Sequence, residues 1–365
     1  MRGKFAETLA ARPGTRVHVA GRAVPAGPGA AAGISLHPLF HGTRRSLDRL
    51  AAQGRYWRLL RRLRPQVVIV HAPELLPLTL LWQLLGRGRQ FLYDIRENYA
   101  LNVSTQHVYR GLTRRVLAAS LRWVEELAAR RAAGLLLAEA SYADELPYLA
   151  AQPRGRVLVL ENKYQPAADE RPPAERRPMP HPTEPLRVLY SGTISVLNGV
   201  WEAVAFAERL RAAWPGGVHL AVVGYCQQPA LLRQLQAAAA RSPEWLSLVG
   251  GAEPVAHAHI VAEMGRSHLG LLPYRPHPST ERCRPTKLFE YLAQGLVIIA
   301  SPNPLWSPLL ARHGAGLQLD FAAPLDAPAL VAALLARTFY PAGPPAEASW
   351  AEEGKKLWHL LDSLR

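Results

Sequence analysis

Short runs of apolar residues, bounded by turn-forming residues, alternate along the chain with longer segments in which apolar residues recur every three or four positions. The short runs are typical of buried parallel strands, and the periodic segments are typical of amphipathic helices. Strands are predicted at 17–20, 34–36, 67–70, 91–93, 134–138, 157–160, 186–190, 220–223, 246–249, 269–272 and 297–300. Helices are predicted at 4–11, 44–63, 76–85, 108–131, 200–213, 229–241, 257–265, 285–295 and 350–364. This alternation indicates an α/β protein with doubly wound parallel sheets.

The segment 166–185 interrupts the alternation. It contains seven prolines in twenty residues and almost no large apolar side chains, which is typical of a linker. We therefore expect a first domain at 1–180 that ends in this Pro-rich linker, a second domain at 181–340, and a C-terminal helix within 341–365. Two such sheets joined by a linker are expected to face a cleft.

Composition narrows the class of protein. The formal net charge is +15, which suggests an anionic partner such as a phosphorylated substrate, an acidic lipid surface or nucleic acid. No nucleic-acid recognition motif is present, so we expect no nucleic-acid partner. The two cysteines, Cys226 and Cys283, are too few for a disulfide framework or a metal cluster. Because no apolar run reaches membrane-spanning length and the start lacks a signal-peptide pattern, we expect a cytoplasmic protein.

Much of the charge lies on two helices of the first half, 44–63 and 108–131, which are rich in arginine. Each is compatible with an amphipathic helix that covers a sheet and presents a solvated Arg face. The alternative is that these faces contact anionic lipid headgroups, which would place the protein peripherally on the inner face of the plasma membrane.

One stretch has chemistry suited to an anion. Residues 284–295 are predicted to form a loop and a helix, and the apolar run 296–300 follows. Pro285 fits a helix start, Thr286 is predicted to cap the first turn, and Gly295 is predicted to end the helix in a left-handed conformation. The unpaired N–H groups of such a first turn attract anions.

The same helix carries Lys287 and, three residues later, Glu290 near the same face. A cation beside backbone donors suits a diphosphate, and a carboxylate one turn away suits a pair of sugar hydroxyls. Together these groups would hold a nucleoside diphosphate. The alternative is a surface helix with a Lys–Glu pair.

Polar residues also follow two predicted strands of the first half. They are His71 and Glu74 after one strand, and Asp94, Arg96 and Glu97 after the next. Because open α/β sheets bind ligands at the carboxyl ends of their strands, these residues are predicted to belong to a site.

Glycine-containing segments follow several strands of the second half. They are Ser191-Gly192-Thr193, Gly224-Tyr225 and Gly250-Gly251, with Leu272-Pro273-Tyr274 after a later strand. Together with Pro285-Thr286-Lys287-Leu288-Phe289-Glu290-Tyr291, these motifs resemble the donor half of GT-B glycosyltransferases, most closely glycosyltransferase family 4, retaining enzymes of bacterial surface-polysaccharide synthesis. His71-Ala72-Pro73-Glu74-Leu75 and Tyr93-Asp94-Ile95-Arg96-Glu97-Asn98 resemble the acceptor half of that family.

The resemblance implies roles for individual residues. Lys287, with the helix start at Thr286 and Leu288, would hold the donor diphosphate, and Glu290 would bind the ribose. The remaining donor-binding residues would be Gly192 and Thr193 near the diphosphate, and Gly224, Tyr225, Gly250 and Gly251 around the base. The loop 273–281 would face the donor sugar. The catalytic residues would be His71 and Lys287. The acceptor-side residues would be Glu74, Asp94, Arg96 and Glu97. The C-terminal helix would pack against the first domain.

The sequence departs from the family pattern at several positions. Thr193 and Asn198 stand where many members carry an Arg and a Lys, so the diphosphate charge would rest mainly on Lys287, with Arg282 or Arg284 as further candidates. Arg96 stands where a His is usual. Glu281 is one residue away from the usual place of a second glutamate. Family chains also open with a strand and a glycine loop, whereas this sequence opens at the helix that follows them, which suggests a misplaced start codon or a truncation.

The resemblance implies transfer of a sugar from a nucleoside-diphosphate sugar to a glycan or lipid-linked acceptor, with retention at the anomeric carbon. The donor half has no Asp-x-Asp motif, so we expect no metal and no cofactor apart from the donor substrate. The alternatives are a nucleotide-sugar epimerase or phosphorylase with the same fold, and a non-catalytic binding protein.

Overall fold

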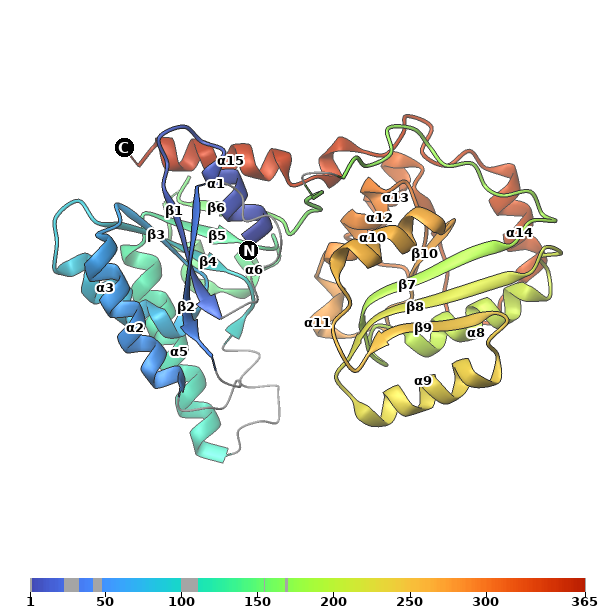
Figure 1. The fold of residues 1–365 in the computed structure, drawn as a ribbon, viewed down its shortest axis with the longest axis horizontal. Coiled ribbons are helices and arrows are strands. Elements are labelled where there is room, and N and C mark those ends of the chain that lie inside the picture. The colour runs from blue at the N-terminus through green and yellow to red at the C-terminus, as the bar shows by residue number, and fades with distance from the viewer. Residues whose placement is uncertain are drawn as a thin grey trace. The chain divides into compact units, whose positions relative to one another are not determined.

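The computed structural model describes residues 2–22, 33–41, 48–99, 111–153, 155–167 and 170–364 (Figure 1). The chain forms two compact units. Unit 1 comprises Met1–Gln165 and Trp350–Arg365, and unit 2 comprises Pro166–Ser349. The predicted starts of the two basic helices, at 44–47 and 108–110, lie outside the described residues.

Unit 1 contains two parallel sheets. Its strands are β1 (Val17–Arg22), β2 (Ile34–Phe40), β3 (Val67–Val70), β4 (Gln90–Ile95), β5 (Gly134–Leu137) and β6 (Val157–Val159). Within the described residues, β1 pairs with β2, while the other four strands form a sheet in the order β3-β4-β5-β6. The helices are α1 (Glu7–Ala10), α2 (Asp48–Leu63), α3 (Leu76–Leu84), α5 (Gly111–Arg131), α6 (Tyr142–Glu145), α7 (Pro147–Ala150) and α15 (Ala351–Asp362). The helix α1 continues a π-helical turn at Arg2–Ala6.

The four-stranded sheet is buried on both faces, which explains the uninterrupted apolar runs in its strands. Tyr93 of β4 packs with Leu80 of α3 and Ala128 of α5 on one face. Its neighbour Leu92 points to the opposite face and packs there with Phe5 and with Leu357 of α15. Successive residues of one strand thus serve two separate cores, as the period of a β-strand requires.

The C-terminal helix α15 belongs to unit 1, although the whole of unit 2 separates it from the rest of that unit in sequence. The backbone N–H of Trp350 donates to the carbonyl oxygen of Tyr164 at 2.6 Å, and its indole N–H donates to the Thr8 hydroxyl at 2.9 Å. Glu353 is fully buried and accepts from Lys163 at 2.7 Å and from Lys356 at 2.9 Å. These contacts hold α15 against the first segment of the chain.

Unit 2 is built on one parallel sheet of six strands. The strands are β7 (Leu186–Ile194), β8 (Val218–Cys226), β9 (Leu246–Gly251), β10 (Leu269–Leu272), β11 (Val297–Ala300) and β12 (Gly316–Gln318). Its helices are α8 (Val200–Arg211), α9 (Pro229–Arg241), α10 (His257–Arg266), α11 (Pro278–Glu281), α12 (Thr286–Ala293), α13 (Ser307–His313) and α14 (Ala327–Ala336). The strand order β12-β11-β10-β7-β8-β9 places the first strand, β7, beside the fourth, β10. This doubly wound order has its switch point between β7 and β10, where open α/β sheets bind ligands.

The prediction of doubly wound parallel order is confirmed for unit 2, and the predicted bounds of β10, β11 and α9 match those of the structure. The strands β7, β8 and β9 extend farther than the apolar pattern indicated. Ser191-Gly192-Thr193, Gly224-Tyr225 and Gly250-Gly251, predicted to lie in turns, are therefore the last residues of strands. The reason is that these glycines keep the ladder register: Gly192 lies opposite Gly224, and Gly224 opposite Gly250. The elements α13, β12 and α14 were not predicted.

The Pro-rich segment after Gln165 belongs to unit 2, so the division falls earlier than the predicted boundary near residue 180. Polar contacts tie this segment to the helices of unit 2. Arg177 donates to the carbonyl oxygen of Met264 at 2.6 Å, and Gln294 donates to Glu170 at 2.8 Å. Proline composition shows that a segment is neither helix nor strand, but it does not show whether the segment packs on a neighbouring surface.

Candidate functional site: a buried lysine at the switch point of unit 2

The helix α12 follows the loop after β10 and has the limits expected from its sequence. Gly295, which follows the C-cap residue Gln294, adopts the predicted left-handed conformation with φ of 65°. The predicted cap is wrong: Pro285, with an extended backbone, occupies the capping position, and Thr286 is the first helical residue. Pro285 has no polar side chain with which to cap the first turn.

Lys287 lies in the first turn of α12 and is only 7% exposed. Its Nζ is 4.8 Å from the ring centre of Tyr190 on β7 and 5.2 Å from that of Tyr274, which follows β10. A Cβ built on Gly192 would lie 3.6 Å from this Nζ. The ammonium group therefore lies at the carboxyl ends of β7 and β10, at the switch point of the sheet.

The ammonium of Lys287 has no hydrogen-bond partner in the described structure. Burial lowers the pKa of Lys287 to about 8, although the nearby Glu290 acts to raise it. A buried cation without hydrogen bonds is costly, and the two tyrosine faces compensate for this only in part. This arrangement favours the binding of an anion at the switch point.

Glycines form a row across the carboxyl ends of three adjacent strands. Gly192, Gly224 and Gly250 lie opposite one another on β7, β8 and β9. A Cβ on Gly224 would lie 1.7 Å from the carbonyl oxygen of Gly192, and a Cβ on Gly250 would lie 2.6 Å from that of Gly224. Only glycine permits this close approach of the strands, and the row leaves backbone rather than side chains at this edge of the sheet.

The other predicted donor residues lie around this edge. Thr193 and Tyr225 are exposed and lie opposite each other on β7 and β8, and Gly251 lies opposite Tyr225 on β9. Leu288 is fully buried, and its N–H donates to the carbonyl oxygen of Pro285 at 2.9 Å. The Leu288 amide is thus already engaged in this structure.

Glu290 lies one turn after Lys287, and its carboxylate is 3.0 Å from Nε2 of His257, the first residue of α10. The side chain of Glu290 is 12% exposed, whereas that of His257 is 51% exposed. The structure thus brings Glu290 together with Lys287 on one helix. Sequence reasoning missed His257, because nothing in the chain pattern links α10 to α12.

The predicted sugar-facing loop, 273–281, contains the short helix α11. Its Arg275 is held against the turn before α8: the Arg275 N–H donates to the carbonyl oxygen of Leu197 at 3.0 Å, and its Nε donates to Glu202 at 2.6 Å. Glu281 is exposed and lies at the end of α11. The side-chain amide of Asn198 donates to the carbonyl oxygen of Thr193 at 3.0 Å.

The acceptor-side candidates gather at the carboxyl ends of β3 and β4 in unit 1. Nδ1 of His71 is 2.6 Å from Oδ2 of Asp94, and Nε of Arg96 donates to the same oxygen at 2.8 Å. Burial acts to raise the pKa of Asp94, but His71 and Arg96 outweigh it and lower this pKa below its ordinary value. Because an ionised Asp94 only accepts hydrogen bonds, Nδ1 of His71 is the donor in this pair.

The two glutamates of this group lie at its edge. Glu74 pairs with Arg49 at 2.7 Å, and Glu97 is exposed. Tyr99 connects the group: its hydroxyl donates to the carbonyl oxygen of His71 at 3.2 Å. Burial, followed by the charges of Glu97, Asp94 and Glu74, raises the pKa of Tyr99 above its ordinary value. The structure therefore brings the four predicted acceptor-side residues into one neighbourhood with His71.

Within the described ranges, no group of three or more His, Cys, Asp and Glu side chains is arranged to hold a metal ion. No helix in this part of the chain has both the length and the apolar composition needed to cross a bilayer.

Solved structures provide the comparison with known proteins. Sucrose-phosphate synthase from Thermosynechococcus elongatus is similar, with a TM-score of 0.61 and 18% identity over 98% of this chain and 91% of that chain. HepE from Anabaena, in complex with UDP-glucose, has a TM-score of 0.55 and 13% identity over 91% of this chain and 86% of that chain. A UDP-forming trehalose-phosphate synthase from Burkholderia xenovorans, in complex with glucose-6-phosphate, has a TM-score of 0.53 and 13% identity over 87% of this chain and 79% of that chain.

No protein-family model matches the sequence, and no curated protein sequence matches it. The likeness therefore lies in the arrangement of the elements, and it extends over both units. The chain has the GT-B fold, with two Rossmann-like units built on parallel sheets.

Proposed function

We propose that the chain is a retaining glycosyltransferase that moves a sugar from a nucleoside-diphosphate sugar to a glycan or lipid-linked acceptor in cell-surface polysaccharide synthesis. The observation that carries this proposal is the ammonium of Lys287, which is buried without a hydrogen-bond partner at the switch point of the unit 2 sheet. The similar structures support the substrate class, since HepE was solved in complex with UDP and with UDP-glucose.

In this proposal the diphosphate of the donor binds beside Lys287. An anion there gives the ammonium the charge partner that it lacks in the ligand-free protein. The row of Gly192, Gly224 and Gly250 lets the nucleotide approach the backbone at the ends of the strands. Glu290, one turn along α12, accepts hydrogen bonds from the ribose hydroxyls and exchanges its contact with His257 for them.

Stabilisation of the leaving group carries much of the catalysis. As the glycosidic bond breaks, negative charge grows on the departing nucleoside diphosphate. Lys287 is already positioned by its packing between Tyr190 and Tyr274, so little reorganisation accompanies its interaction with this charge. The short α12 adds the N–H dipoles of its first turn on the same side.

We assign the acceptor to unit 1. Asp94 fixes the ring of His71 and its proton, so that Nε2 is directed to substrate as a neutral acceptor of a hydrogen bond. Arg96 keeps Asp94 ionised. Glu74 and Glu97, at the edge of this group, are polar contacts for acceptor hydroxyls. The cleft between the two domains and the retaining outcome stay predictions.

The cellular setting follows from charge. The arginines of α2 and α5 favour peripheral association with an anionic membrane surface, where lipid-linked acceptors reside. We propose a cytoplasmic protein that binds reversibly to the inner face of the membrane.

A panel of nucleotide sugars, each incubated with the protein and a lipid-linked oligosaccharide extract, tests the reaction by mass spectrometry. We expect one donor to yield a glycosylated acceptor and free nucleoside diphosphate, and NMR of the product to show the donor's anomeric configuration. Formation of an epimerised nucleotide sugar from donor alone would instead identify an epimerase. Lys287→Ala should lower turnover at least about 100-fold, because a charge-assisted contact to the leaving group is lost.

A further inference from the structure

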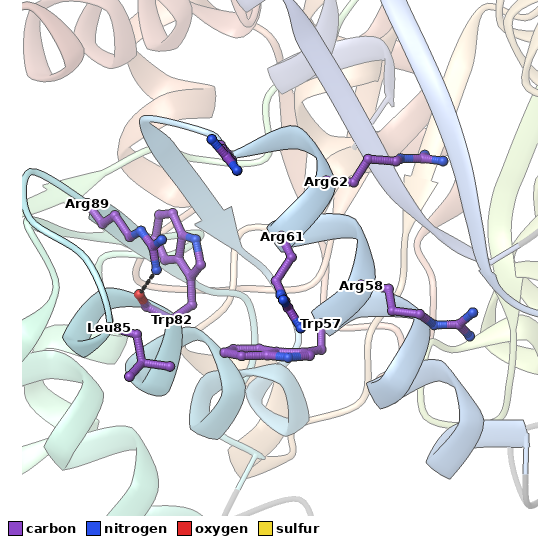
Figure 2. Close-up of a pocket in the computed structure, with 8 residues that line it drawn as sticks. Trp57, Arg58, Arg61, Arg62, Trp82, Leu85 and Arg89 are labelled. Carbon is purple, nitrogen blue, oxygen red and sulfur yellow. Dashed lines mark hydrogen bonds between the residues drawn. The ribbon is translucent and has the colours of Figure 1, made fainter.

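A second basic site lies in unit 1 and involves none of the residues assigned to donor or acceptor. It is an open pocket of about 680 Å³ between the carboxyl ends of α2 and α3. Figure 2 shows its side chains, with Arg61 extending from α2 toward the ring of Trp57. Five arginines line it: Arg58, Arg61, Arg62, Arg64 and Arg89. No Asp or Glu is among the described residues that line it.

No described acidic side chain neutralises the guanidinium groups of this Arg pocket. Arg89 donates to the carbonyl oxygen of Trp82 at 2.5 Å, and Arg58 has a long contact to a carbonyl oxygen of its own helix. Arg62 lies 3.4 Å from a ring nitrogen of His37. Within the described chain, none of the five arginines forms an ion pair.

Helix dipoles account for only part of this charge. Each helix C-terminus is equivalent to about −0.5 elementary charge, so the ends of α2 and α3 together offer about −1. Five guanidinium groups therefore leave about four positive charges concentrated around one hollow. Like charges at this spacing repel, and an anion with more than one accepting oxygen relieves the repulsion.

The rest of the pocket is aromatic and apolar. Trp57 and Trp82 line it, and the buried indole N–H of Trp82 has no hydrogen-bond partner in the described structure. Leu81 and Leu84 of α3 and Leu85, which directly follows the helix and lines the pocket, share one face and are 43%, 65% and 62% exposed. Arginine and tryptophan next to exposed leucines are typical of surfaces that contact the headgroup region of a bilayer.

We infer that the Arg pocket binds the phosphate group of an anionic phospholipid headgroup while the leucine face of α3 enters the membrane interface. Planar guanidinium groups offer paired N–H donors to phosphate oxygens, and Trp57 lies at the level of the headgroups. A soluble polyanion would give the exposed leucines no partner, and this favours a lipid. The inference rests on the proposed membrane association and names its site.

Vesicle sedimentation tests the inference with the full chain. The probe is a phosphatidylcholine vesicle with or without phosphatidylglycerol. The test variant is Arg58→Gln/Arg61→Gln, which changes two exposed residues of α2. The matched control is Arg233→Gln/Arg241→Gln, which removes the same charge from exposed positions of α9 in unit 2. Leu84→Ser tests the apolar contact.

We expect the wild type and the α9 control to bind the anionic vesicles and not the neutral ones. The Arg58/Arg61 variant should partition about 30-fold more weakly, equivalent to about 2 kcal/mol, and Leu84→Ser should also bind more weakly. Inorganic pyrophosphate should displace the wild type more effectively than sodium chloride of equal ionic strength. Circular dichroism checks that each variant is folded.

Three results would overturn the inference. Equal binding by the Arg58/Arg61 variant and the α9 control would show that only net charge matters. Binding of pyrophosphate or random duplex DNA without binding to anionic vesicles would replace the lipid by a soluble anion or nucleic acid. Absence of vesicle binding by the wild type would remove the membrane association as well. Calorimetry with nucleoside diphosphates separates these failures from a failure of the donor site, because the pocket variants should bind the donor nucleotide normally.

Discussion

Replacing Lys287 by Met is expected to make the ligand-free protein more stable and to weaken its binding of nucleoside diphosphates. Met has a similar length and no charge, so it fits between the rings of Tyr190 and Tyr274 without requiring an anion. A residue that serves only the fold would give the opposite result, because its removal would destabilise the protein.

The size of the effect follows from the pKa of Lys287. Burial lowers this pKa from 10.5 to about 8, and each unit corresponds to about 1.36 kcal/mol, so the charged form costs about 3 kcal/mol in the folded state. Below pH 8 Lys287 is charged in the folded and in the unfolded protein, so the folded protein is destabilised by the full free energy of burying the charge. Between pH 8 and 10.5 the folded protein loses the proton that the unfolded chain keeps, so the cost declines and the wild type gains stability as pH rises.

Urea unfolding at about pH 7 and at about pH 10 measures this difference, with and without the nucleoside diphosphate that binds best. Because the nucleotide is expected to bind unit 2, the unfolding transition whose midpoint it shifts is the transition of unit 2. At the lower pH, Lys287→Met should raise the free energy of that transition by up to about 3 kcal/mol, and the gain should shrink at the higher pH. Lys287→Arg, which keeps a charge, is the control. A variant that is less stable at neutral pH and binds nucleotide as the wild type does would refute the reasoning.

Three further predictions concern other parts of the account. Asp94→Asn should lower turnover by about 100-fold or more without changing nucleotide affinity, because the amide no longer fixes the proton of His71 on Nδ1. Steady-state kinetics measures the turnover, and calorimetry measures the nucleotide affinity. Gly224→Ala should destabilise unit 2 by at least about 2 kcal/mol, since the new Cβ would overlap the carbonyl oxygen of Gly192, and an unchanged melting curve would contradict the reported close approach. Glu353→Gln should destabilise unit 1 by about 3 kcal/mol because it removes the charge of a buried carboxylate that pairs with Lys163 and Lys356. Urea unfolding that leaves the unit 2 transition in place checks this result.

Local signals in the sequence predicted the backbone of the site well. The apolar runs before and after α12 predicted β10 and β11, and Gly295 marked the end of the helix. These features depend on neighbouring residues, so a single sequence reveals them. The cap was misassigned because Thr286 is a good capping residue by type, whereas Pro285 occupies that position in the chain.

The surroundings of Lys287 could not be predicted in the same way. Tyr190 and Tyr274 lie on separate elements, and only the pairing of β7 with β10 brings them to one ammonium group. His257 meets Glu290 for a similar reason. The extension of β7 past Tyr190 was hidden because glycine and polar residues interrupt its apolar run, although the ladder continues. Contacts of this kind are set by topology and register, which the apolar pattern of one chain does not contain.

The central claim is that unit 2 binds a nucleoside diphosphate through Lys287. Isothermal titration calorimetry of UDP, ADP, GDP and TDP against the wild type and Lys287→Gln tests it most directly. We predict that at least one nucleotide binds the wild type, and that its affinity falls by about 100-fold in the variant, because a charge-assisted contact is lost. Binding of none of the four nucleotides, or equal binding by both proteins, would contradict the account.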